Sequence, residues 1–147
     1  MKKYVVMLVL LLSPVLVAEE LFMVRSQLSF PEAMTVLQQA IRENGYQVSR
    51  VQRIDIGLTR SGYKTDKYRV VFFGNLQEIR KISDQYPELV AYLPQKIAIF
   101  AENDETILLS SSFKHLRPFY SSADLLASFA QWETDIQRIL ERVRIEE

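Results

Sequence analysis

The sequence predicts an α+β fold, in which a curved antiparallel sheet packs against helices and a long helix ends the chain. Three observations predict it. Segments with the two-residue period of strands alternate with segments that have the 3.6-residue period of amphipathic helices. Residues 59–66 and 102–105 are short polar connections of the kind that join neighbouring strands. Residues 121–144 carry a continuous apolar stripe, typical of a helix that covers a sheet.

The first two elements of the domain are a strand and a helix. Residues 21–30 alternate between apolar and polar side chains, which predicts a half-buried strand. The helix over residues 29–45 has a marker at each end. Ser29 and Glu32 have the spacing of a capping box, and Gly45 supplies a residue that tolerates the left-handed conformation at a helix end.

Two further strands are expected before the middle of the chain. Residues 46–58 are predicted as a strand with an irregularity near Arg50, where the apolar pattern changes phase and a bulge is expected. After the loop at 59–66, residues 67–74 are apolar at successive positions. Such a run predicts a strand that is buried on both faces.

A second helix and a corner follow. Asn75 and Glu78 repeat the capping-box spacing, and an apolar stripe continues from them. The segment 87–94 begins and ends with proline, which stops one helix and suits the first turn of a short new one. We therefore expect a helix–kink–helix corner that places Leu89 and Leu93 in the core.

The last part of the domain is predicted as a hairpin and the long helix. Strands at 96–101 and 106–113 flank the tight turn at 102–105. Ser121 and Asp124 fit a third capping box. The helix face expected to pack on the sheet comprises Leu125, Phe129, Trp132, Ile136, Ile139 and Val143, and the side chains expected to face water are Gln131, Asp135, Arg138 and Arg142.

The N-terminal segment has the pattern of a secretory signal peptide. Two lysines precede an apolar stretch at residues 4–18, which is shorter than the ~20 residues that a membrane-spanning helix needs. We expect cleavage after Ala18, with an uncleaved N-terminal anchor as the alternative. Residues 19–147 are then expected to form a single α+β domain in the periplasm, in contact with the membrane only through an uncleaved N-terminus.

Composition argues against several classes of chemistry. The chain has 18 basic and 18 acidic residues, which predicts no nucleic-acid partner. It has no cysteine, one histidine and four glycines, none of them in a nucleotide-binding motif, so we expect no metal and no cofactor. A hydrolase that uses a carboxylate or His115, the single histidine, stays open as an alternative to a non-catalytic protein.

Aromatic side chains are the most distinctive class, with eight phenylalanines, seven tyrosines and one tryptophan. The simplest interpretation is a core between the sheet and the final helix, and the alternative is an apolar pocket in the same place. The residues expected to form this core or pocket are Phe72, Phe100, Phe113, Phe129 and Trp132.

Three stretches resemble the family called domain of unknown function 302: "LSFPEAMTVLQQAIRENGYQV", "VVFFGN" and "YPELVAYLPQKIAIF". The resemblance covers roughly residues 22–113. It departs at Leu76, where the family usually has proline, and at Tyr86, where an acidic residue is usual. It implies a compact α+β domain with a curved antiparallel sheet, and it implies no reaction.

These observations together predict an exported, non-catalytic accessory domain that binds a small apolar ligand or a protein partner in the cell envelope. The alternatives are the hydrolase and a membrane-tethered interaction module.

Overall fold

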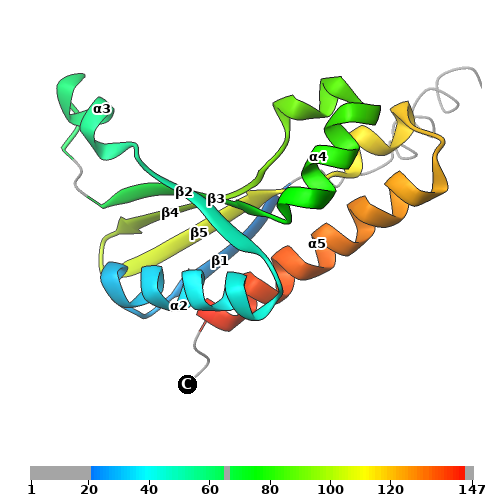
Figure 1. Cartoon of the computed structure of the whole chain (residues 1–147). Coiled ribbons are helices and arrows are strands. Elements are labelled where there is room, and N and C mark those ends of the chain that lie inside the picture. The colour runs from blue at the N-terminus through cyan, green and yellow to red at the C-terminus, as the bar shows by residue number, and fades with distance from the viewer. Residues whose placement is uncertain (1–20, 65–66, 145–147) are drawn as a thin grey trace, which may run out of the picture.

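The computed structural model describes residues 21–64 and 67–144 (Figure 1). Its centre is a five-stranded antiparallel sheet with the strand order β1-β5-β4-β3-β2. The strands are β1 (Leu21–Ser26), β2 (Gln47–Arg53), β3 (Tyr68–Gly74), β4 (Gln95–Glu102) and β5 (Glu105–Ser111). The expected signal peptide at residues 1–18 and its cleavage after Ala18 lie outside the described residues.

Helices cover one face of this sheet. The two long helices, α2 (Phe30–Glu43) and α5 (Ala123–Val143), lie on the same side of it (Figure 1). The shorter elements are α3 (Asp55–Arg60), α4 (Leu76–Gln85), η1 (Pro87–Ala91) and η2 (Lys114–Phe119). The fold class predicted from the sequence, α+β with a long C-terminal helix, is confirmed.

The first helix begins as its capping residues predict. The Glu32 carboxylate accepts hydrogen bonds from the Ser29 hydroxyl at 2.6 Å and from the Ser29 backbone N–H at 3.0 Å. These bonds stabilise the charged carboxylate and hold the pKa of Glu32 below its usual value. After the helix ends, Gly45 adopts a φ of +82°, the left-handed conformation expected there.

The prediction of a strand over residues 46–58 is wrong in its second half. The expected bulge is present, between Val48 and Arg50, but β2 ends at Arg53 and α3 follows. The Asp55 carboxylate explains the change of direction. It is buried at the start of α3 and accepts from Arg53 Nη2 at 2.8 Å and from Arg69 Nη1 at 2.5 Å. The hydrogen bond from Arg53 is the main reason that the pKa of Asp55 is lowered, and the charge of Arg69 adds to it.

Strand β3 is buried on one face only, contrary to the prediction for residues 67–74. Val71 and Phe73 point toward the helices and are fully buried. Phe72 points the other way and is half-buried. The residues of the run are apolar on both faces, but no helix of the described residues covers the second face of the sheet (Figure 1).

The corner at residues 87–94 is structural, as predicted. Helix α4 is capped by Asn75, whose side chain accepts from the backbone N–H groups of Gln77 and Glu78 at 3.0 and 3.1 Å. After α4 ends, η1 turns the chain into β4. Leu89 and Leu93 are buried in the core.

Two details of the last third differ from the sequence predictions. The cap of α5 is Ser122, whose hydroxyl accepts from the Leu125 N–H at 3.4 Å, so the helix starts one residue later than the spacing of Ser121 and Asp124 indicates. The apolar face of α5 is buried as expected. Asp135, expected to face water, is buried as well. Within residues 21–64 and 67–144, no helix has the length and hydropathy of a membrane span.

The corner yields a test of stability. Leu93→Ala removes a core side chain that is 8% exposed, and it should lower the free energy of unfolding by roughly 2–5 kcal/mol. The matched control is Val90→Ala, because Val90 lies between Leu89 and Leu93 but is 58% exposed. This substitution should change the free energy of unfolding by less than about 0.5 kcal/mol. Denaturant unfolding measures both, and an unchanged midpoint for Leu93→Ala would show that the segment is not part of the core.

Candidate functional site

The face of the sheet opposite α2 and α5, here called the open face, is apolar across four strands. Successive side chains of a strand point to opposite faces, so the strand register assigns each residue. The apolar side chains on the open face are Leu21 and Met23 of β1, Ile107 and Leu109 of β5, Ala98 and Phe100 of β4, and Tyr68, Val70 and Phe72 of β3. Leu21 is 64% exposed and Met23 is 55% exposed, so this surface is in contact with water.

The centre of the open face is hollowed. The depression, here called the strand hollow, has a volume of about 270 Å³. Its lining is made by Leu21, Val70, Lys96, Ala98, Leu109, Ser110 and Ser111. Ala98 on the central strand β4 is the smallest of the apolar lining residues. We conclude that the hollow exists because a small side chain stands among larger ones on neighbouring strands.

The two ends of the open face differ in charge. At one end, Arg25 pairs with Glu105 at 2.9 Å and with Glu102 at 3.6 Å, so one cation stands between two carboxylates. At the other end stand Lys96 on β4 and Arg50 on β2, on either side of Phe72. Both are exposed, and neither has an ion-pair partner in the described part of the chain.

The five aromatic residues proposed as a core or pocket are divided by the sheet. Phe129 and Trp132 of α5 are buried together with Phe113, and the centroids of these three rings are 5.2 to 5.8 Å apart. Phe72 and Phe100 lie on the open face, where the Phe100 ring meets Tyr68 edge-on at 5.3 Å. The first three therefore fill the space between the sheet and the helix, and the last two are available at the surface.

The candidate catalytic residues do not converge. His115 is exposed on η2, and its ring lies 5.6 Å from the ring of Tyr92. Three successive serines occupy residues 110–112. Ser110 is buried and donates to the Lys96 carbonyl at 2.8 Å, while Ser111 points to the open face. Among the described residues, no group of three acidic or histidine side chains is placed to hold a metal ion.

A second depression lies between η1 and η2. This helical-turn hollow has a volume of about 460 Å³ and is lined by Glu88, Ala91, Tyr92, Leu116, Phe119 and Tyr120. The Tyr120 hydroxyl donates to Glu88 across it at 3.0 Å. The hollow is larger than the strand hollow, but it is built on short 3₁₀ turns, and sites on regular strands hold their geometry more accurately. We therefore place the main candidate site on the sheet.

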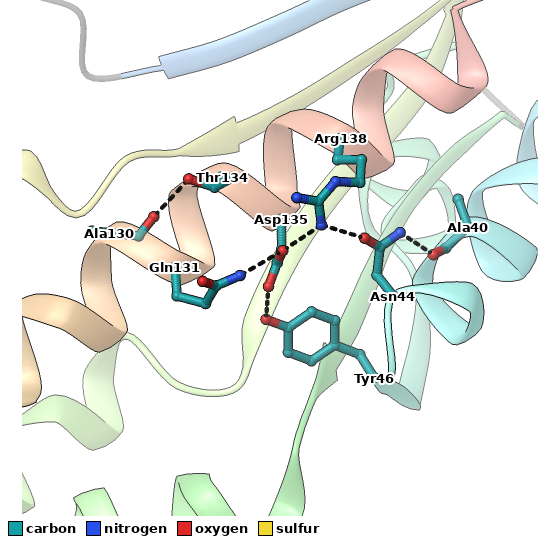
Figure 2. Close-up of polar contacts among 8 residues, drawn as sticks. All are labelled: Ala40, Asn44, Tyr46, Ala130, Gln131, Thr134, Asp135 and Arg138. Atoms are coloured by element: carbon teal, nitrogen blue, oxygen red, sulfur yellow. Dashed lines mark hydrogen bonds and ion pairs between the residues drawn. The ribbon is translucent and has the colours of Figure 1, made fainter.

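Helix α5 is fixed to the rest of the domain by two buried acids that sequence analysis did not identify. Asp135 accepts from the Tyr46 hydroxyl at 2.6 Å and from Arg138 Nη1 at 2.7 Å, as Figure 2 shows. Arg138 also donates to the Asn44 side chain at 3.0 Å (Figure 2). Asp135 is thereby the point at which α5 is joined to the end of α2.

The second acid is Glu133. Its carboxylate accepts from the Phe113 backbone N–H at 2.7 Å and from Arg117 Nη2 at 3.0 Å. Both acids occupy positions beside the apolar stripe of α5, where a sequence pattern indicates solvent. The sequence carries little signal of these contacts, since Tyr46, Phe113 and Arg117 lie 16 to 89 positions away from the acid that each of them binds.

Comparison with known proteins gives a family and a fold. A family model described as Domain of unknown function DUF302 matches residues 22–143. The crystal structure of an uncharacterized conserved protein DUF302 from Bacillus stearothermophilus is similar over 86% of this chain and 100% of that chain, with a TM-score of 0.74 and 19% sequence identity. At this identity the likeness concerns the fold alone. No curated protein matches the chain.

The Tyr46–Asp135 contact predicts a pH dependence of stability. Burial, and then the hydrogen bond to Asp135, raise the pKa of Tyr46 well above its ordinary value of 10. Above pH ~10 the unfolded chain loses this proton and the folded chain keeps it, so stability must fall as pH rises, by about 1.4 kcal/mol per pH unit for one proton. Tyr46→Phe should remove the contribution of this phenol to the pH dependence. At pH 7 the same substitution should lower the free energy of unfolding by about 1–3 kcal/mol, because Asp135 loses a hydrogen-bond donor.

Unfolding by denaturant at several pH values between 7 and 11 measures the effect. The control is Tyr63→Phe, since Tyr63 is 64% exposed and its removal should leave the pH dependence as it is. If Tyr46→Phe and the wild-type protein lose stability equally above pH 10, the phenol does not hold its proton in the way described.

Proposed function

The chain belongs to the DUF302 family, and from this premise and the geometry of its sheet we propose that it is a non-catalytic domain that binds an apolar ligand or partner on the open face. The observation that carries the proposal is the strand hollow, which lies in an apolar surface that no helix of the described residues covers. Soluble proteins rarely expose contiguous apolar surface without a use for it, and such patches mark binding sites.

The lining of the strand hollow supports binding more than catalysis. Four of its residues, Leu21, Val70, Ala98 and Leu109, are apolar. The others are Lys96, Ser110 and Ser111, and no acid or histidine among the described residues lines it. A serine acts as a nucleophile only with a base within hydrogen-bond reach. In the described part of the chain no hydrogen bond joins the Lys96 ammonium to either serine, and the Ser110 hydroxyl donates to the Lys96 backbone carbonyl instead. The hydrolase alternative would have to use His115, which lies on η2 with its ring 5.6 Å from that of Tyr92 and does not line the strand hollow.

The proposal includes export to the cell envelope. It is supported by the n-region, apolar region and small final residue of the segment ending at Ala18. The mass of the protein recovered from the envelope fraction tests this part. A mature N-terminus at Glu19 agrees with cleavage and removes the membrane-tethered alternative, while an intact Met1 contradicts cleavage.

Binding to the open face is tested with a neutral apolar dye, N-phenyl-1-naphthylamine. Ala98→Trp places a large ring in the strand hollow on a strand position where aromatic residues are well tolerated, and it should weaken dye binding tenfold or more. Gln137→Trp adds the same ring to an exposed position of α5 and serves as the matched control, with binding unchanged. Thermal unfolding of both variants confirms that they fold.

The result that would contradict the proposal is equal dye binding by the wild-type protein and Ala98→Trp. The fluorescence of Trp132, the single tryptophan, gives an independent control when decanol is the ligand, because decanol is neutral and has no chromophore. Trp132 is buried on the other side of the sheet, so binding on the open face should leave its emission maximum in place. A shift of that maximum would instead locate the ligand between the sheet and α5.

A further inference from the structure

The strand hollow limits the size of its ligand. Its volume of about 270 Å³ is below the roughly 300–1,000 Å³ of pockets that enclose drug-sized molecules. It extends from Leu21 on β1 to Val70 on β3, across three strand spacings, which corresponds to about 14 Å. A long and shallow hollow of this kind fits a single extended apolar chain.

A second copy of the protein fits the hollow less well. Two open faces packed together would place one depression against another, and the space between them would stay empty. Protein interfaces that are stable are packed as densely as protein interiors, and each unfilled cavity costs stability. An apolar chain fills the depression that a second sheet would leave.

The charge at the hollow is one-sided. Lys96 and Ser111 line it next to its apolar residues, and no carboxylate does so. In the described ranges, the Lys96 ammonium has no ion-pair partner, in contrast to Arg25 at the far end of the face. Arg50 adds a second exposed cation on the same side of the face, beyond Phe72. An ammonium and a hydroxyl beside an apolar depression match a single carboxylate that is attached to an apolar chain.

We propose that the open face binds an anionic amphiphile, a monocarboxylic acid of medium chain length whose chain lies in the strand hollow and whose carboxylate pairs with Lys96. This inference rests on the proposed function, because it names the ligand class of the same site. The apolar contact supplies most of the affinity, and the ion pair supplies the preference for an anion, since exposed ion pairs contribute little free energy.

The test compares three ligands with the same chain and different head groups: decanoate, decanol and decyltrimethylammonium. Binding to the full chain is measured by displacement of N-phenyl-1-naphthylamine at low ionic strength, below the micelle concentrations. Decanoate should bind about threefold to fivefold more tightly than decanol, and decyltrimethylammonium should bind most weakly. Added salt should reduce the difference, because Lys96 is exposed and screened.

Variants at position 96 separate charge from shape. Lys96→Gln should abolish the preference for decanoate over decanol, and Lys96→Glu should reverse the order so that decyltrimethylammonium binds most tightly. Lys81→Glu makes the same charge change on α4, beside a different depression, and should leave the order as in the wild-type protein. Lys96 is exposed, so these substitutions leave the core intact.

The outcomes distinguish this inference from the function on which it rests. Equal binding of decanoate and decanol, unchanged in Lys96→Glu, overturns the carboxylate ligand and leaves apolar binding in place. No binding of any of the three ligands overturns both. Concentration-dependent dimers that Ala98→Trp dissociates would show that a second copy covers the open face, which also overturns the carboxylate ligand.

Discussion

The covering of only one face of the sheet is the constraint on which the rest of the structure depends. Helices α2 and α5 bury the side chains on that face, and Phe113, Phe129 and Trp132 fill the space beneath α5. Two buried acids hold α5 in place, Asp135 through Tyr46 and Glu133 through the Phe113 N–H. The three rings pack against one another, so side chains fill the space between the sheet and the middle of α5. No helix of the described residues covers the opposite face, which has the strand hollow near its centre, and this is the face that we propose for binding.

The charge distribution follows from the same arrangement. On β4 the side chains at alternate positions, from Lys96 through Ala98 and Phe100 to Glu102, all point to the open face. One strand therefore presents a cation, an apolar centre and an anion along a single line. The anion at Glu102 is near Arg25, whereas the cation at Lys96 meets water. The two ends of the open face therefore differ in charge, whereas the ends of a purely apolar surface would be alike.

Local signals in the sequence predicted much of the fold and less of the site. Capping residues and periodicity located α2, α4 and the face of α5, because those features depend on neighbours within one helical turn. The end of β2 was missed because Asp55 is held by Arg69, a contact between residues 14 positions apart. Asp135 was expected to face water because its partner Tyr46 lies 89 positions away.

The apolar run of β3 indicated two buried faces, but periodicity cannot show whether a second layer of structure exists to bury the second face. The strand hollow could not be predicted for a related reason, since it requires the register that aligns Ala98 with Val70 and Leu109.

The location of a bound ligand tests the central claim, that the open face is the binding site, more directly than any affinity. Backbone amide resonances of the isotope-labelled protein, followed by NMR during titration with decanoate, report that location residue by residue. The account predicts that the largest shifts occur at Val70, Lys96, Ala98 and Leu109, with small shifts along α5. Shifts concentrated at Tyr92, Phe119 and Tyr120 would place the ligand in the helical-turn hollow between η1 and η2, and they would contradict it.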